Sequence, residues 1–259
     1  MQRNLKPFLF SLVLVACVSA VWGMTVLAGS TTKTMHPVTA EANTKAVSKT
    51  ALYDSLRLDT LELSKEAFLY AMQGYKNLQD KGELPNDRIL TIADFSLPSS
   101  KKRLFIIDME TGKLLFNTFV SHGRNSGTEM ATHFSNRIDS HQSSLGFFIT
   151  GTTYNGRNGY SLKLDGMEDG INNNALARAI VVHGSAYVNE RIASAKGYIG
   201  RSFGCPAVPS KLAKVIINTI RNGSCLFIYG NDNTYLTMSK ILSQPYPLLT
   251  DTMIADTMG

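Results

Sequence analysis

The stretch "KRLFIIDMETGKLLFNTFV" at residues 102–120 contains two apolar runs, rich in Ile, Leu and Phe, on either side of a polar turn. Short runs of β-branched and aromatic residues are typical of strands. The turn places Gly112 where a hairpin needs a positive φ angle, which glycine adopts without a steric penalty. We therefore predict an antiparallel β-hairpin at this position.

Five further runs have the same composition as the strands of this hairpin and are separated by Gly, Asn, Asp or Ser. They are "RILTIADFSL", "SLGFFITGTTY", "GYSLKLDG", "ARAIVVHG" and "SCLFIYGN". In "ARAIVVHG", the four apolar residues 179–182 predict a strand buried on both faces. One segment differs, because residues 209–223 have the spacing of a helix that ends at Gly223, with an apolar face made of Leu212, Val215, Ile216 and Ile220. One helix among about seven strands favours a mainly β domain over residues 87–232, and not alternating βαβ units.

The chain before this domain has a helical pattern. Apolar residues recur at spacings of three and four over residues 50–86, which predicts two helices, and Ser64 is placed to cap the second of them. Gly82 and Pro85 end that helix. We expect this N-terminal helical segment to pack on the β domain, because Tyr70, Tyr75 and Leu78 need a surface to cover. To the C-terminal tail, residues 233–259, we assign no role.

The first 29 residues resemble an export segment. Arg3 and Lys6 precede a run from Phe8 to Gly29 without any charged residue, as in a signal peptide or a membrane anchor. Cleavage, retention as an inner-membrane anchor and lipidation at Cys17 all stay open. Each of them places the rest of the protein in the bacterial cell envelope, outside the cytoplasm. Residues 30–49, rich in Ser, Thr, Ala and Lys, are interpreted as a flexible linker.

Composition gives weaker information. The 259 residues are 44% hydrophobic, which suffices for a core, and their formal net charge is +6. This charge alone does not identify an anionic partner. No Lys/Arg-rich block with interleaved aromatic residues occurs, so we predict no nucleic-acid partner. We also expect a monomer.

The cysteines outside the export segment are Cys205 and Cys225. In an oxidising compartment, two free thiols are unusual unless one has a task. A disulfide between them would close a loop of about 20 residues and contribute roughly 3 kcal/mol. Cys225 alternates with Phe227 and Tyr229 in an expected strand, which favours a small buried apolar residue.

Cys205 has the surroundings that a nucleophile needs. A cysteine nucleophile requires a base and backbone N–H groups that stabilise the oxyanion formed on a carbonyl. His183 ends an expected buried strand and is a candidate base, although a lone histidine there is commonly structural. Pro206 has no N–H, so an oxyanion hole must use Phe203, Gly204 or Cys205. Gly204 would let the backbone approach a substrate closely.

Together, "RAIVVHG" and "GRSFGCPAV" resemble the catalytic signature of the L,D-transpeptidases, the YkuD-like cysteine enzymes that remodel bacterial peptidoglycan. The resemblance is strongest to the murein L,D-transpeptidase catalytic domain family and covers roughly residues 50–232. It extends through "KKRLFIIDMETGKLLFNTFVSHGRNSG", "FSNRIDSHQSSLGFFITGTTYNGRNGYSLKL" and "CLFIYGND".

The resemblance implies a β-sandwich-like L,D-transpeptidase domain with a helix after the catalytic cysteine. It implies that Cys205 is the nucleophile and His183 the base, whose ring the carbonyl of Gly184 would orient. The implied substrate is a peptidoglycan stem tetrapeptide. Cys205 would attack the carbonyl of the third residue, a diamino acid, and release D-alanine. An amine would then accept the acyl group to form a cross-link, or water would accept it in an L,D-carboxypeptidase reaction.

The chain departs from the family pattern at several positions. Phe203 stands where the family has a histidine, and Ala207 stands where it has a cationic or amide residue. Arg201 could replace the lost contact with a substrate carboxylate, although a structural role is equally compatible with its position. The 22 positions between His183 and Cys205 exceed the usual spacing, which predicts an extra loop around residues 186–196. We count Ser202 and Gly184, which lie beside the pair, as substrate-binding candidates.

Other histidines suggest no metal. His122 follows a strand and precedes a Gly/Asn/Ser loop, so it lines the substrate groove or stabilises the loop. His133 and His141 have no ligand spacing with it, and no HExxH motif occurs. We predict neither a metal nor another cofactor. Three hypotheses stay open: an L,D-transpeptidase, a non-catalytic peptidoglycan-binding protein with the same fold, and a structural envelope protein with a Cys205–Cys225 disulfide.

Overall fold

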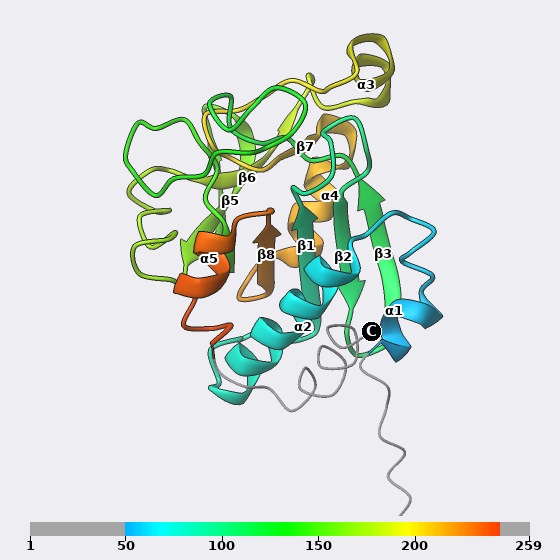
Figure 1. The fold of residues 1–259 in the computed structure, drawn as a ribbon. Helices are drawn as coiled ribbons and strands as arrows, with labels where there is room; N and C mark the ends of the chain where they lie inside the picture. The colour runs from blue at the N-terminus through cyan, green and yellow to red at the C-terminus, as the bar shows by residue number, and fades with distance from the viewer. Residues whose placement is uncertain (1–49, 244–259) are drawn as a thin grey trace, which may run out of the picture. The chain divides into compact units, whose positions relative to one another are not determined.

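The computed structural model describes residues 50–243. Its strands form one sheet in the order β3-β2-β1-β8-β4-β5-β6-β7. The prediction of a mainly β domain is confirmed (Figure 1). The bounds of the strands are β1 Ile89–Asp94, β2 Leu104–Asp108, β3 Lys113–Thr118, β4 Gly146–Gly156, β5 Gly159–Gly166, β6 Val181–Ser185, β7 Ala207–Pro209 and β8 Cys225–Tyr229.

Within residues 50–243, five helices accompany this sheet: α1 Ala51–Ser55, α2 Lys65–Asp80, α3 Glu190–Lys196, α4 Ser210–Ile220 and α5 Asn233–Met238. In the view of Figure 1, α2 lies in front of β1 and β8, and α4 lies behind β1. No helix within residues 50–243 is long and apolar enough to cross a membrane. The predicted export segment 1–29, the predicted linker 30–49 and the tail after residue 243 lie outside the described residues.

The predicted hairpin is confirmed as β2 and β3. Asp108 pairs with Lys113 at its closed end, and the φ angle of Gly112 is +62°. Asp108 accepts the backbone N–H groups of Glu110 and Thr111, which stabilises the turn. Local turn chemistry therefore determines this part of the sheet.

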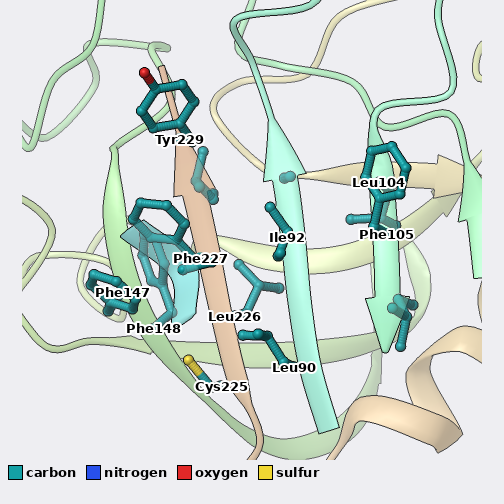
Figure 2. Packing of buried hydrophobic residues seen from close by; sticks show 14 of the residues in the cluster. Leu90, Ile92, Leu104, Phe105, Phe147, Phe148, Cys225, Leu226, Phe227 and Tyr229 are labelled. Carbon is teal, nitrogen blue, oxygen red and sulfur yellow. The ribbon is translucent and has the colours of Figure 1, made fainter. Parts of the chain in front are cut away.

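The core is centred on β1 and β8, which run parallel to each other and are buried along their whole lengths. The rings of Phe147 on β4 and Phe227 on β8 stack with centroids 4.3 Å apart. Figure 2 shows the aromatic and aliphatic side chains of these neighbouring strands packed together. Burial of this continuous apolar surface is the main stabilising contribution to the sheet.

Helix α2 covers this core as predicted. The side chain of Ser64 caps it by accepting the backbone N–H of Ala67, 3.3 Å away. Tyr75 and Leu78 are buried, and the ring of Tyr70 stacks on that of Tyr229 with centroids 6.1 Å apart. The prediction that these residues cover a surface of the β domain is confirmed.

Three local predictions need correction. The buried strand begins at Val181 and not at Ala179, whose φ angle of +53° is incompatible with a regular strand. The predicted helix is α4, but its buried face is shifted from the predicted one: Val215 is 48% exposed, and the buried residues are Ala213, Ile216, Ile217 and Ile220. The predicted extra loop contains a helix, α3, capped by Asn189.

The segment after Asn231 joins the domain, although the sequence indicated no role for it. Helix α5 is followed by a turn whose carbonyls at Ile241 and Leu242 accept hydrogen bonds from Asn77 and Gln73 on α2. The buried carboxylate of Glu168 accepts hydrogen bonds from Tyr235 and Ser239. These polar contacts between distant segments attach residues 233–243 to the body of the protein.

Candidate active site

Cys205 lies in a short turn between an isolated bridge at Ser202 and strand β7. The hydroxyl of Ser202 donates to the carbonyl of Cys205, 2.6 Å away, and accepts the N–H of Gly204 at 3.1 Å. The φ angle of Gly204 is +122°, a conformation that other residues rarely adopt. One serine side chain thus closes the turn that carries the cysteine.

His183 comes from strand β6, beside β7. It pairs with Ala207 on β7 and with Ser161 on β5. Its Nδ1 lies 3.0 Å from the carbonyl oxygen of Gly184. Because a carbonyl only accepts, Nδ1 carries the proton in this arrangement and Nε2 keeps its lone pair. The predicted hydrogen bond from the ring to Gly184 is present.

Cys205 and His183 line the same pocket, which has a volume of about 460 Å³. Its lining also includes Arg201, Ser202 and Gly184, three of the predicted substrate-binding residues. Four other pockets of the described chain contain neither a cysteine nor a histidine in their linings. The remaining lining residues are Arg157, Asn158, Arg178, Ala179, Ser185, Tyr187 and Phe203.

The thiol and the imidazole are both held in their neutral forms by burial. Cys205 is 9% exposed, and its S–H donates to the carbonyl of Ala179 over 3.6 Å. Burial raises the pKa of the thiol, while the backbone N–H of Val181 and the charge of Arg178 act against this rise. Burial lowers the pKa of His183, and its hydrogen bond to Gly184 partly offsets the effect. Any thiolate in this pocket must therefore form by transfer of its proton to a base.

The predicted role of Gly204 needs correction. Its N–H is already bound to Ser202, so this group is not available to stabilise an oxyanion. A Cβ on Gly204 would lie 2.8 Å from the carbonyl oxygen of Gln142 and 3.0 Å from a side-chain carbon of Ile180. The tight packing of the turn on its neighbours and the positive φ angle are sufficient reasons for a glycine there.

His122 is not a substrate-binding residue, because its side chain lies in the protein interior with 0% exposure. Its Nδ1 accepts a hydrogen bond from Arg103 over 2.7 Å, and its Nε2 donates to the carbonyl of Gly127 over 3.1 Å. Burial, followed by the charge of Arg103, lowers its pKa to about 4. Of the two predicted roles of His122, the structure agrees with loop stabilisation.

Arg201 lines the pocket and also makes structural contacts. Its Nη1 donates to the carbonyls of Gly127 and Arg124 at 2.9 and 3.2 Å, and lies 3.4 Å from the hydroxyl of Thr128. Gly127 is therefore held from two sides, by His122 and by Arg201. These contacts hold the loop after β3 against the mouth of the pocket.

The hypothesis of a Cys205–Cys225 disulfide is wrong, because both thiols are free. Cys225 lies on β8 between Leu90 on β1 and Ile149 on β4, and it is completely buried. Burial raises its pKa well above the ordinary value of a thiol. Within residues 50–243, no group of histidine, cysteine and acidic residues is arranged to hold a metal ion.

A family profile described as the L,D-transpeptidase catalytic domain matches residues 59–229, which is most of the chain. The chain belongs to this family. The match begins before α2 and ends with β8, so it takes in the helical covering of the sheet as well as the pocket. The predicted fold class is confirmed: a mainly β L,D-transpeptidase domain with a helix after Cys205 and an N-terminal helical extension.

Solved L,D-transpeptidase structures are distant from this chain. A structure from Mycobacterium smegmatis has 12% identity and a TM-score of 0.35, over 55% of this chain and 59% of that one. One from Stackebrandtia nassauensis has 16% identity and a TM-score of 0.34, over 65% and 68%. The cell shape determining protein Pgp2 from Campylobacter jejuni has 14% identity and a TM-score of 0.38, over 63% and 56%. No curated protein matches the chain.

The mycobacterial L,D-transpeptidase is matched over less than two thirds of its length. Phe203, which stands where the resemblance predicts a histidine, is 61% exposed at the mouth of the pocket. Its ring lies 4.6 Å from that of His141 and 4.9 Å from the guanidinium carbon of Arg124. Ala207 is completely buried on β7 and cannot contact a substrate.

Two arginines that line the pocket were not among the predicted site residues. Arg178 lies three residues before β6, the strand that carries His183, and Arg157 lies in the turn between β4 and β5. The available signal was the position of Arg178 inside the motif "RAIVVHG" itself. For Arg157 the indication was weaker, because a single cationic residue in a Gly- and Asn-rich turn is ordinarily an exposed residue without a function.

Proposed function

We propose that this protein is a peptidoglycan L,D-transpeptidase in which Cys205 is the nucleophile and His183 is the general base. The observation that carries the proposal is a single pocket lined by both side chains, with the histidine hydrogen-bonded so that Nε2 is free to accept a proton. Strand β6 and the turn before β7 supply the two groups, and nucleophilic catalysis by cysteine requires such a base beside the thiol.

The proposed reaction begins with transfer of the thiol proton from Cys205 to Nε2 of His183. The sulfur then forms a bond to the carbonyl carbon of the third residue of a stem tetrapeptide. The bond from this carbon to the nitrogen of D-alanine breaks, and His183 returns the proton to the leaving amine. A thioester remains, and an amine or water breaks its carbon–sulfur bond in the second half of the reaction.

We assign the oxyanion contact of this reaction to the backbone N–H of Cys205. The N–H of Gly204 is occupied by Ser202, and Pro206 has none. Ser202 would act by holding the turn, because its hydroxyl bonds to both Gly204 and Cys205. The hydroxyl therefore holds the two peptide units on either side of the one whose N–H faces the developing negative charge.

The charge of the pocket favours an anionic peptide. Its lining contains three arginines and no acidic residue. Arg157 makes no hydrogen bond or ion pair with a described residue, whereas Arg201 uses Nη1 on the neighbouring loop. We propose that Arg157 and Arg201 bind carboxylates of the stem peptide, which a guanidinium recognises by paired hydrogen bonds.

This carboxylate assignment is tested with two otherwise identical stem tetrapeptides, one with a free side-chain carboxylate on the diamino acid and one with that group amidated. Arg157→Gln should raise KM about 10-fold for the free acid and leave the amide within about twofold, since one charge-assisted hydrogen bond contributes about 1.5–3 kcal/mol. An equal effect on both peptides would contradict the assignment.

The proposed substrate also determines where the protein works. Peptidoglycan lies outside the cytoplasm, so we propose an extracytoplasmic location in the bacterial cell envelope, reached through the N-terminal segment. The protein would act without a cofactor, because the sulfur and the imidazole supply the whole acyl transfer. Its proposed partners are stem peptides, and it would act as a monomer.

The central test uses Cys205→Ala beside Cys225→Ala as the matched control. With a purified stem tetrapeptide, mass spectrometry should detect release of D-alanine and a thioester adduct for the wild type and for Cys225→Ala. Cys205→Ala should form no adduct, and turnover should fall by at least about 10³-fold, as for the loss of other covalent nucleophiles. Full activity in Cys205→Ala would remove Cys205 from the mechanism.

A second candidate function is non-catalytic binding of peptidoglycan. It is favoured by one contact: the S–H of Cys205 donates to the carbonyl of Ala179, which keeps the proton on sulfur. A binding protein would sediment with insoluble peptidoglycan equally well as wild type and as Cys205→Ala, and neither would form an adduct. An adduct in the wild type excludes this candidate.

A further inference from the structure

Arg178 is the arginine of the pocket whose two terminal nitrogens, Nη1 and Nη2, both donate hydrogen bonds within the protein. Nη1 donates to the carbonyl of Ser135 and the hydroxyl of Ser144, at 2.7 and 2.5 Å. Nη2 donates to the carbonyl of Gln142 and the hydroxyl of Ser140, at 2.5 and 3.1 Å. Four hydrogen bonds thus hold this half-buried cation in one position and hold the loop 135–144 around it.

The loop held by Arg178 packs directly on the cysteine turn. The hydroxyl of Ser143 lies 3.3 Å from the carbonyl oxygen of Gly204 and donates to it. A Cβ on Gly204 would lie only 3.3 Å from Nη2 of Arg178. The guanidinium therefore lies against the residue that precedes Cys205.

The chain next to Arg178 also contacts the sulfur. Ala179, the following residue, accepts the S–H of Cys205, and the N–H of Val181 acts on the same sulfur. Arg178, Ala179 and Cys205 line one pocket. The segment 178–181 thus surrounds the thiol, with a cation at its beginning and a backbone donor at its end.

The partners of Arg178 are all neutral. Carbonyl and hydroxyl oxygens satisfy its donors, and none of the ion pairs of the described residues includes it. Removal from water disfavours such a cation, and burial indeed lowers its pKa. When the thiol of Cys205 loses its proton, the thiolate becomes a counterion for the guanidinium, and the attraction between the two charges stabilises both.

We propose that Arg178 is a positioning residue that presents a fixed positive charge to the sulfur of Cys205 and so stabilises the thiolate formed on proton transfer to His183. The inference rests on the proposed function for its purpose, but its electrostatic part concerns the free thiol alone. Because four hydrogen bonds fix the charge in advance, the site needs no rearrangement when the anion forms. In this partly buried position the interaction exceeds that of a solvated ion pair.

The experiment measures the rate at which iodoacetamide alkylates Cys205 in the full-length protein as a function of pH. Iodoacetamide is neutral, so a change of protein charge does not alter its own attraction to the site. Three variants are compared. Arg178→Gln removes the charge, and Arg178→Lys keeps a charge with different geometry. Ser144→Ala keeps the guanidinium and removes the hydroxyl that accepts from Arg178 and donates to Ser135.

Removal of the charge in Arg178→Gln should raise the apparent pKa of the thiol by about one pH unit or more, and should slow alkylation at pH 7 about 10-fold. Arg178→Lys should stay within about threefold of the wild type. Ser144→Ala should leave the pH profile unchanged. Circular dichroism and the protection of Cys225 from alkylation verify that each variant is folded.

Two results would overturn the proposal. An unchanged profile in folded Arg178→Gln would leave Arg178 as a structural clamp only, and so would equal shifts in Arg178→Gln and Ser144→Ala. If Arg178→Gln does not fold, Arg178→Lys provides the test. A shift of one pH unit in the apparent pKa of the thiol, although the charge is retained, would contradict an electrostatic role. A wild type that is inactive on stem peptides, but whose thiol responds as expected, would refute the proposed function and leave this inference intact.

Discussion

Two buried thiols in this protein lie in opposite surroundings. Cys225 occupies a regular position in the central strand β8, in the cluster of buried apolar side chains (Figure 2). Cys205 lies in a glycine-containing turn, where a carbonyl, a backbone N–H and a guanidinium surround it at the edge of a pocket. Burial raises the pKa of both. The comparison teaches that burial alone does not distinguish an inert thiol from a candidate nucleophile, whereas the polar groups around it do.

The largest expected effect is a difference in alkylation between the two thiols. Iodoacetamide should modify Cys205 in the folded protein, since this side chain lines the pocket. Cys225 should react at least about 10³-fold more slowly, because exposing the central strand requires most of the free energy of unfolding, about 5–15 kcal/mol. Peptide mass spectrometry after timed labelling measures both rates. As a control, both thiols should be modified in guanidinium. Equal alkylation rates of Cys205 and Cys225 in native buffer would contradict the proposed difference between the two thiols.

The next effect concerns the base. His183→Ala should lower kcat/KM on stem tetrapeptides by about 10²–10⁴-fold, the usual contribution of general acid–base catalysis. His133→Ala, which removes an exposed histidine bonded to Thr132, serves as the control and should stay within about twofold of the wild type.

The pH profile of the wild type provides a further measurement on His183. Protonation of the base abolishes activity, and burial lowers the pKa of His183 below 6.5. The acid limb of kcat/KM should therefore have its midpoint below pH 6.5. A midpoint above pH 6.5 would indicate that another group is the base.

A smaller effect separates His183 from the interior histidine, His122. The pKa of His122 is about 4 in the folded protein and about 6.5 when unfolded, so the unfolded state binds its proton first as the pH falls. The free energy of unfolding should therefore decline by roughly 3 kcal/mol between pH 6.5 and 4 through this residue. Comparing denaturant titrations of wild type and His122→Gln isolates the effect, because Asp94 and Glu168 titrate in both proteins. Parallel pH curves for the two proteins would contradict this prediction.

The smallest expected effect concerns Cys225, the thiol that we expect to be inert. Cys225→Ser places a hydroxyl among apolar side chains and should lower the free energy of unfolding by about 1–3 kcal/mol. Turnover of stem peptides at 25 °C should change less than twofold, because the residue does not touch the pocket. Denaturant titration and the D-alanine release assay measure the two quantities. A loss of turnover without a loss of stability would connect Cys225 to the chemistry.

Much of the fold was predictable from local chemistry. The hairpin turn at Gly112, the cap at Ser64 and the helix α4 depend on residues close together in the sequence, and all three are present. The buried face of α4 was predicted wrongly because apolar residues occur on more than one face of this helix. Only packing against the sheet decides that Ile217 is inside and Val215 outside.

The candidate site divides in the same way. Cys205 and His183 were identifiable from their motifs, and the structure brings them to one pocket. The hydrogen bond of Gly204 and the choice between the two predicted roles of His122 were not predictable, because residue type does not say which partner a group binds. The hydroxyl of Ser202, two residues away, accepts a hydrogen bond from the N–H of Gly204. Arg103, which directly precedes β2, donates a hydrogen bond to the ring of His122.

The amino-acid sequence by itself determined most of the strands and turns, and it indicated which sulfur and which imidazole are candidates for chemistry. These properties depend on backbone preferences and side-chain chemistry within a few residues. Only the tertiary structure decided which nitrogen of His183 is free, which N–H beside Cys205 is already used, and that Arg178 stands next to the sulfur. The reason is that hydrogen bonding and electrostatic interaction depend on distance through space, and the groups concerned come from segments that only folding brings together.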